Sequence, residues 1–205
     1  MAYNPRDFYF KQAKKDDFAA RSAYKLEEID QRHRIIHSND HIVDLGAAPG
    51  SWSQYCARKI GKNGRILGID LQKIAITLPN ARFIQEDLHN VDLEKEIRET
   101  EMRFPVDVVI SDMAPRTTGI RLTDQARSLE LCELALNMAI KCLKPGGHFV
   151  CKLFQSEDFE DYRKSLKENF EKVEILRPKS TRKESKEVFL IGLKFKPKVK
   201  SSETT

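Results

Sequence analysis

The sequence predicts a single α/β domain built on a doubly wound, mostly parallel sheet. From residue 41 onward, short apolar runs that suit strands alternate with amphipathic stretches that suit helices. Such alternation is typical of a parallel sheet that carries helices on both faces. The chain has 205 residues, which is enough to bury the core of one domain. We therefore expect a Rossmann-like architecture.

The first strand–helix–strand unit begins at His41. HIVDLG is a short apolar run that ends in glycine, and WSQYCARKI is amphipathic at helical spacing. GRILGID is a second apolar run and ends in an acid. Together these three segments predict one βαβ unit with its loops at the carboxyl ends of the strands.

Further strands and a long helix follow this unit. The strand-like runs are ARFIQED, VDVVISDMAP and GHFVCKLF, and residues 122–143 read as a helix that ends at the turn Pro145, Gly146, Gly147. The last two runs, KVEILRP and EVFLIGLKF, lie too close together for a crossover helix. They should pair antiparallel. The result is a sheet of seven strands, of which the last is antiparallel.

Charge separates an almost neutral middle of the chain from two basic ends. Residues 1–37 have a net charge of +2, residues 38–170 of −2 and residues 171–205 of +5. Binding to a polyanion depends on local basic clusters more than on global charge. This distribution suits a catalytic core with a basic rim, although a solvated surface with a frayed lysine-rich tail also fits it.

We expect one domain, residues 1–205, with three parts. Residues 1–37 should form a basic helical appendage, with a helix near residues 20–29, and residues 38–196 the catalytic core. Residues 197–205 should be a flexible tail.

Several protein classes are disfavoured by composition. No apolar run approaches the roughly 18 residues of a membrane-spanning helix, and the N-terminus resembles neither a signal peptide nor an organellar presequence. We therefore expect a cytoplasmic, monomeric protein without membrane association. The cysteines lack CxxC pairs and zinc spacing, so we expect buried thiols and no metal site; they are Cys56, Cys132, Cys142 and Cys151.

The predicted strand ends are acidic and predict a nucleoside pocket. After the first strand, Gly46 and Gly50 allow a tight turn and close approach to a ligand, and the loop lacks the GxGxxG spacing that seats a dinucleotide pyrophosphate. Asp70 ends the second strand, where it can accept hydrogen bonds from ribose hydroxyls, and Asp87 follows the third, where it can bind an adenine amine. Either acid alone is also an ordinary strand-end residue. Trp52 is either part of this pocket or core packing.

Two further side chains predict a catalytic crevice. Asp112 ends the fourth strand, and Lys152 lies within the fifth among apolar neighbours. A buried ammonium is costly unless an acid or a function compensates for it. Lys152 is therefore either a catalytic group or one half of a structural ion pair with Asp112.

At this point the sequence resembles the FtsJ/RrmJ-type RNA 2′-O-methyltransferases over nearly its whole length, and within them the bacterial large-subunit ribosomal RNA enzymes. The motifs that carry the resemblance are RSAYKL, VDLGAAPGSWSQ, SDMAP, CKLF and SKEVFLIG. By motif, the family's catalytic tetrad corresponds to Lys25, Asp112, Lys152 and Glu187. Ser51 departs from the family's Gly-Gly-Trp, as also occurs in its transfer-RNA branch.

The resemblance implies a methyltransferase fold and S-adenosylmethionine as cofactor, bound by Gly46, Gly50, Trp52, Asp70, Asp87 and Asp112. It also implies a ribose 2′-hydroxyl of a uridine in large-subunit ribosomal RNA as the methyl acceptor. We interpret Lys152 as the general base. A free lysine has a pKa of about 10.4, so a lysine base needs burial or nearby positive charge. Lys25 and the sulfonium can supply that charge.

Basic residues beside the outer tetrad members are expected to hold the RNA backbone. They are Arg21, Lys179, Arg182 and Lys183. Transfer RNA is the alternative substrate, and an RNA-binding assembly factor that retains a cofactor pocket is the non-catalytic alternative. A nicotinamide dehydrogenase is disfavoured by the missing GxGxxG motif. Tyr24 and Phe154 can stack on a base, but core packing is the more ordinary role for both.

Overall fold

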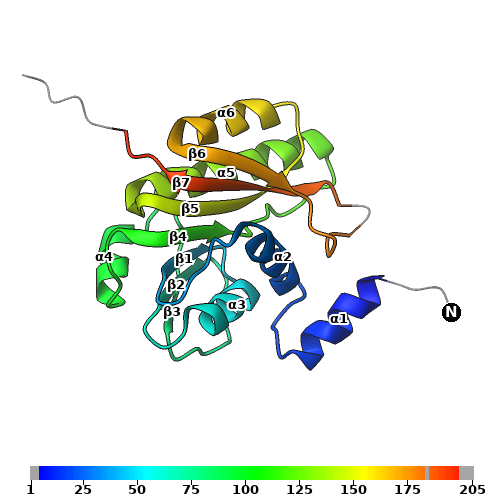
Figure 1. Cartoon of the computed structure of the whole chain (residues 1–205). Coiled ribbons are helices and arrows are strands. Elements are labelled where there is room, and N and C mark those ends of the chain that lie inside the picture. The colour runs from blue at the N-terminus through cyan, green and yellow to red at the C-terminus, as the bar shows by residue number, and fades with distance from the viewer. Residues whose placement is uncertain (1–4, 183–184, 199–205) are drawn as a thin grey trace, which may run out of the picture.

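The computed structural model describes residues 5–182 and 185–198. Lys183 and most of the predicted tail, residues 199–205, lie outside the described residues. One sheet of seven strands forms the centre of the molecule, in the order β3-β2-β1-β4-β5-β7-β6 (Figure 1). The strands are β1 (His41–Leu45), β2 (Arg65–Asp70), β3 (Ala81–Gln85), β4 (Val106–Ser111), β5 (Leu143–Phe154), β6 (Phe170–Leu176) and β7 (Glu187–Phe195).

The strand directions confirm the predicted sheet. Strands β1 to β5 pair in parallel, whereas β7 runs antiparallel to both of its neighbours, β5 and β6. The helices are α1 (Pro5–Lys15), α2 (Ala23–His33), α3 (Ser51–Ile60), α4 (Leu93–Glu99), α5 (Arg121–Cys142) and α6 (Phe159–Asn169).

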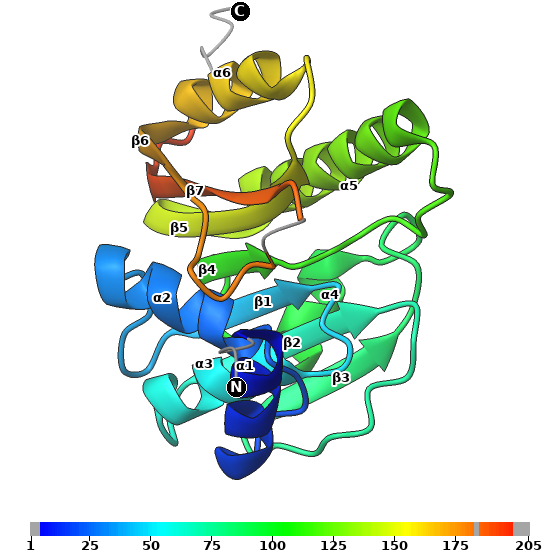
Figure 2. The same ribbon diagram turned by 90° about the vertical axis from the view of Figure 1, so that its right-hand side faces the viewer.

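Helices cover both faces of the sheet, so its central strands are apolar on both sides (Figures 1 and 2). Val43 and Leu45 of β1 face a core cluster shared with α4, α5 and α6. Ile42, on the other face, joins a second cluster with α2 and α3. The alternation of side chains along a strand produces these two layers.

The N-terminal segment is more deeply integrated than the predicted appendage. Ala23, Leu26 and Ile29 of α2 have no exposed surface, and Leu26 and Ile29 belong to the second core cluster. Helix α1 lies beyond α2, away from the sheet (Figure 1). The appendage is therefore α1 alone, and α2 is a core helix.

Asp30 fixes α2 against the rest of the domain. Its Oδ1 accepts hydrogen bonds from the backbone amides of Ile35 and Ile36, at 3.1 and 2.9 Å. Its Oδ2 accepts one from the Tyr55 hydroxyl at 2.7 Å and lies 3.3 Å from the Lys59 ammonium, both on α3. This carboxylate is 2% exposed, and its partners compensate for its burial.

The predicted turn at Pro145–Gly147 lies inside β5. Val106 of β4 pairs with Leu143 and Val108 pairs with His148, so residues 144–147 form a bulge in the longer strand. Gly146 has a φ of 77°, which suits a residue without Cβ. The strand therefore begins where α5 ends, earlier than the sequence predicted.

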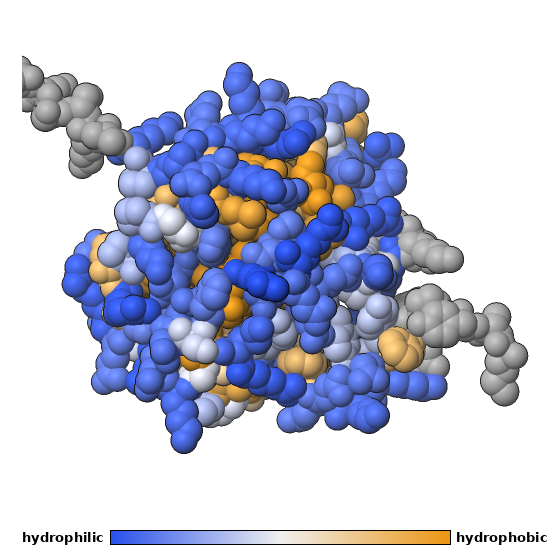
Figure 3. Space-filling model, in the orientation of Figure 1, coloured by the Kyte–Doolittle hydropathy of each residue, from blue (hydrophilic) through white to orange (hydrophobic). Residues whose placement is uncertain are grey.

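The surface in the view of Figure 3 is mostly hydrophilic, and apolar atoms gather over β6 and β7. None of the helices in the described part of the chain is long and apolar enough to cross a membrane. All four cysteines are buried free thiols, as predicted.

We expect Asp30→Ala to lower the free energy of unfolding by about 3 kcal/mol, because it leaves two buried amides and a hydroxyl without their acceptor. Urea denaturation measures the change. Glu130→Ala is the matched control, since Glu130 is an exposed helical acid whose loss should cost about 0.5 kcal/mol or less. Equal effects of the two variants would contradict the role of Asp30.

Candidate active site

The order of the strands creates a topological switch point between β1 and β4, which is where an open α/β sheet forms its ligand crevice. The chain proceeds outward from β1 through β2 to β3, then returns to place β4 on the other side of β1. Leu45 and Ser111, the last residues of β1 and β4, are paired neighbours. Ligands of open α/β sheets bind outside the carboxyl ends of the strands at such a switch point.

The loop after β1 follows a path that only small residues permit. Gly46 has a φ of 74° and Gly50 a φ of 107°. A Cβ at Gly46 would overlap the side chain of Met113, and one at Gly50 would overlap the side chain of Ile76. The glycines therefore let the backbone lie close to the neighbouring loops at the mouth of the crevice.

Asp70 and Asp87 both lie at strand ends, as predicted. Asp70 Oδ2 accepts a hydrogen bond from the Ala48 amide at 2.9 Å, which ties the end of β2 to the glycine loop. Asp87 follows β3, and its Oδ1 accepts a hydrogen bond from the His89 amide at 3.0 Å. The structure thus places Asp70 directly at the loop, and Asp87 at the end of the next strand outward.

Sequence reasoning missed a third acid, Asp44, within β1. This residue has no exposed surface, and its Oδ2 accepts a hydrogen bond of 2.6 Å from the Ser53 hydroxyl. Oδ1 is buried without a hydrogen-bond partner among the described residues. Burial, with repulsion from Asp112 and Asp70, raises the pKa of Asp44 to about 7 in spite of the Ser53 hydrogen bond. An acid inside an apolar strand was the available signal.

We expect Asp44 to make the protein less stable as pH rises. The ordinary pKa of an aspartate is 3.8, which applies to the unfolded chain, and that of Asp44 in the folded protein is about 7, so between these pH values the folded state binds a proton that the unfolded chain has lost. The stabilisation is complete below pH 3.8 and is lost as pH rises through 7. Asp44→Asn should make the free energy of unfolding less dependent on pH in this range, by up to about 1.4 kcal/mol per pH unit. Urea melts from pH 4 to 8 test it, and parallel curves for both proteins would contradict it.

Trp52 is directed into the core. Its side chain is 2% exposed, lies 5.7 Å from the Phe189 ring and donates an indole hydrogen bond of 2.9 Å to the Ser22 carbonyl. Ser51 Oγ lies 2.7 Å from Ser22 Oγ. These contacts join the start of α3 to the residue before α2. The indole thus packs in the core, and contact between Trp52 and a cofactor stays a prediction.

Lys152 and Asp112 form a pair at the ends of β5 and β4. The ammonium lies 2.9 Å from Asp112 Oδ1 and 2.5 Å from the Asp112 carbonyl oxygen. Lys152 is 8% exposed. The amine is therefore held by one hydrogen bond to the carbonyl and by an ion pair with Oδ1, which itself has no hydrogen-bond partner among the described residues.

Lys25 and Glu187 form a second pair beside the first. The Lys25 ammonium contacts Glu187 Oε1 and lies over the Phe189 ring, 5.7 Å from its centre. Burial raises the pKa of Glu187, but attraction to Lys25, their hydrogen bond and attraction to Lys152 outweigh it, so that the pKa is below its usual value. The structure thus brings together all four side chains of the predicted tetrad.

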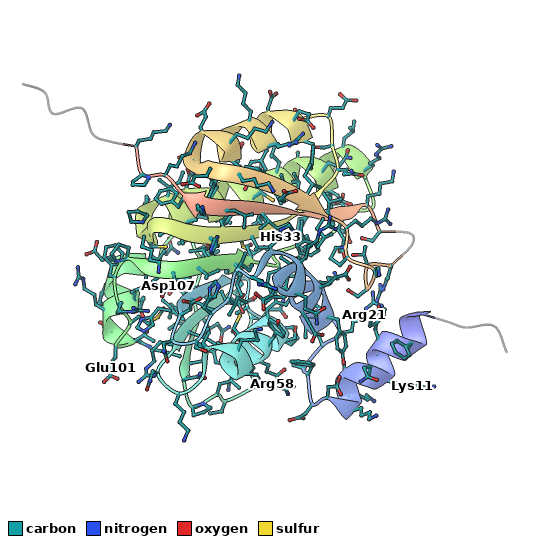
Figure 4. The ribbon with its side chains drawn as sticks, in the orientation of Figure 1. Lys11, Arg21, His33, Arg58, Glu101 and Asp107 are labelled. Atoms are coloured by element: carbon teal, nitrogen blue, oxygen red, sulfur yellow. The ribbon has the colours of Figure 1, made fainter. Side chains whose placement is uncertain are left out.

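The predicted RNA-binding residues lie near the Lys25 end of the site. Glu28 of α2 accepts a 2.8 Å hydrogen bond from the Lys179 amide, so the β6–β7 loop lies against α2. Lys179 and Arg182 are exposed on this loop. Figure 4 shows Arg21 where α1, α2 and the loop come together.

A sheet in this order, with its seventh strand antiparallel and a glycine loop at its switch point, defines a Rossmann-like methyltransferase. A solved structure from Plasmodium falciparum, described as a putative ribosomal RNA methyltransferase, has a TM-score of 0.75 at 27% identity and covers 87% of this chain and 98% of its own. A SAM-dependent O-methyltransferase from Thermotoga maritima shares the fold, with a TM-score of 0.57 at 16% identity; the match covers 82% of this chain and 63% of that one.

The chain belongs to the FtsJ-like methyltransferase family, whose model matches residues 18–195. A relative from Bdellovibrio bacteriovorus, named ribosomal RNA large subunit methyltransferase E, is 56% identical over 96% of this chain and 100% of its own length. A relative of the same name from Oleidesulfovibrio alaskensis is 50% identical over 93% of this chain and 92% of its own length. The match begins after α1, which agrees with the peripheral place of that helix.

Family membership implies S-adenosylmethionine as cofactor, and the crevice fits it. The turn at Gly46 and Gly50 offers close backbone approach, and Asp70 offers a carboxylate at the end of β2. Asp44 is the next-to-last residue of β1, just before the loop, and its buried Oδ1 has no hydrogen-bond partner among the described residues. A buried polar atom needs such a partner, which a ligand at this place can supply. An acidic crevice also attracts a cation.

Proposed function

We propose that this protein transfers a methyl group from S-adenosylmethionine to a ribose 2′-hydroxyl of a uridine in large-subunit ribosomal RNA. The observation that carries the proposal is the convergence of two buried lysine–carboxylate pairs beside the switch-point crevice. The names of the curated relatives support the substrate class. A methyl transfer to oxygen needs alignment and a base, and both pairs supply fixed polar groups for these tasks.

In this mechanism the cofactor supplies an already activated methyl group. Lys152 would accept the proton of the 2′-hydroxyl as that oxygen takes the methyl group, and the sulfonium would leave as a neutral thioether. The Asp112 carbonyl accepts a hydrogen bond from the Lys152 amine and the Asp112 carboxylate lies 2.9 Å from it, so Asp112 determines where the nitrogen lies. The low exposure of Lys152 keeps water from competing for this position.

Lys25 and Glu187 position the ribose. Glu187 is the first residue of β7, and Lys25 reaches it from α2. Their ion pair offers both a donor and an acceptor to sugar hydroxyls. Trp52 and Ser51 support this arrangement, because they bind Ser22 one turn before Lys25.

The RNA must present an unpaired nucleotide to this site. The major groove of an A-form helix is too narrow for side chains to read, and sequence-specific enzymes act on nucleotides in loops or bulges. Arg21, Lys179 and Arg182 lie beside Lys25 and Glu187 and are suited to bind the flanking phosphates.

We expect Lys152→Ala and Lys152→Met to abolish methylation while cofactor binding persists. The assay uses labelled S-adenosylmethionine with free ribosomal RNA, large subunits that lack the modification, and transfer RNA, and it maps label by resistance to alkaline cleavage. Calorimetry measures cofactor binding. Lys144→Ala is the matched control, because Lys144 pairs with Asp107 at the opposite end of the same two strands and should retain activity.

Retained methylation in both Lys152 variants would contradict the base assignment. Label found only in transfer RNA would show that transfer RNA is the substrate. Label that alkaline digestion of ribosomal RNA yields only in mononucleotides would exclude ribose 2′-methylation, because a 2′-O-methyl group prevents cleavage of the next phosphodiester bond.

We expect the double variant Lys179→Ala, Arg182→Ala to bind ribosomal RNA with a weaker salt dependence. Each lost phosphate contact lowers the slope of log K against log salt by about 0.7–0.9. Filter binding at several salt concentrations measures it. Lys164→Ala, Lys167→Ala on the exposed face of α6 is the control, and equal slopes for the two double variants would remove the loop from the RNA interface.

A further inference from the structure

An aromatic side chain at the end of β5, that of Phe154, is not part of the hydrophobic core. Phe154 is partly exposed, and it is absent both from the two core clusters and from the apolar residues packed against them. Its backbone is fixed, because its amide donates a 3.1 Å hydrogen bond to Ser128 Oγ of α5. This placement removes the core-packing role that the sequence suggested for it.

The strand register puts Phe154 on the same face as the paired residues. Lys152 and Phe154 are two positions apart on β5, so their side chains project from one face. Phe154 is directly opposite Glu187 on β7, and Lys152 is opposite Phe189. Residues directly opposite in an antiparallel pair also share a face. The ring is thus the next side chain outward from Lys152 and Glu187.

A hollow opens beside this ring. It has a volume of about 240 Å³ and is lined by Phe154, Gln125, Gln155, Ser185, Asp124, Arg121 and Lys186. An adjoining hollow of about 510 Å³ shares Arg121, Gln125 and Gln155 with it. The first is smaller than the roughly 300–1,000 Å³ of pockets for drug-sized ligands, which suits a single planar ring.

The rim of the hollow combines positive charge with exposed apolar side chains. Arg121 and Lys186 are exposed, on α5 and before β7. Ile120 and Leu122 are 63% and 75% exposed at the start of α5. Asp124 holds the loop before them, since it accepts hydrogen bonds from the amide and hydroxyl of Thr118, at 2.7 and 2.9 Å. The apolar side chains are therefore presented on a fixed turn.

We propose that this hollow binds the base of the nucleotide that is methylated, with the base stacked on Phe154. The proposal rests on the proposed function and adds to it the site of the base. The base and the 2′-oxygen are attached to adjacent carbons of one sugar, so a 2′-oxygen at Lys152 requires its base within one sugar's length of that amine. Phe154 is the aromatic surface at that distance along β5.

The remaining groups fit an unstacked nucleotide. Arg121 and Lys186 are placed for the phosphates on either side of it, while the Asp124 carboxylate is already bound by the Thr118 amide and hydroxyl and the Gly119 amide. Ile120 and Leu122 are suited to take the place of the extruded base against its former neighbours, as apolar wedges do in nucleic acids. Phe154 is in this account a positioning residue that touches the substrate.

We expect Phe154→Ala to lower kcat/KM for ribosomal RNA by about 5- to 150-fold, which corresponds to the ~1–3 kcal/mol of a base–aromatic stack. Phe154→Leu should show most of this loss, because it keeps apolar bulk without a π face. Phe154→Tyr is the matched control and should stay near wild type. Cofactor affinity and melting temperature are measured for all three variants and should change little.

A double-mutant cycle separates stacking from a structural effect. After the modified position has been mapped, an RNA is ligated with an abasic ribose there, which retains its 2′-hydroxyl. Wild type should lose the same factor on this RNA as Phe154→Ala loses on normal RNA. Phe154→Ala should lose nothing more on the abasic RNA.

Multiplicative losses in the cycle, or full activity of both Phe154→Ala and Phe154→Leu, would overturn the base site. Both of these results require that the wild-type protein methylates ribosomal RNA, so they leave the proposed function intact. Absence of methylation by wild type would instead contradict the proposed function itself, so the two failures are distinguishable.

Discussion

Burial of two lysine–carboxylate pairs at one edge of the sheet is the constraint on which the rest of the site depends. The four charged side chains are largely shielded from solvent, and a buried charge without its partner strongly destabilises a protein. Lys152 and Asp112 come from neighbouring parallel strands, and Lys25 and Glu187 come from α2 and β7. The helix and the strands must therefore be held at fixed separations, which explains the bonds made by Asp30, Ser51 and Trp52.

The antiparallel direction of β7 has a chemical result. In a parallel strand only the last residues reach the edge where ligands bind. Because β7 runs the other way, its first residue, Glu187, lies at that edge opposite Phe154. The inserted strand thus brings a residue from near the end of the chain to Lys152, without lengthening the parallel strands.

The sequence predicts the sheet well because alternation of short apolar runs reports strands that are covered on both faces. The family resemblance also singles out the four side chains that the structure pairs, and strand termini single out Asp70 and Asp87, while the catalytic and cofactor-binding roles of these residues stay predictions. The sequence did not predict a role for Asp44, because a single acid inside an apolar run forms no periodic pattern. Its burial depends on α3 and the neighbouring strands. The bulge at residues 144–147 is set by pairing with β4, which no local pattern encodes. The freedom of Phe154 from the core likewise emerges only from the packing of α5 against β5.

The distance along the chain between Lys25 and Glu187 has a consequence for biosynthesis. Helix α2 leaves the ribosome early, but its lysine acquires a partner only when β7 has been made and has inserted between β5 and β6. Closing so long a loop is entropically costly until the intervening strands are in place. The two ion pairs therefore come together only in the completed sheet, after the last strand has taken its place between β5 and β6.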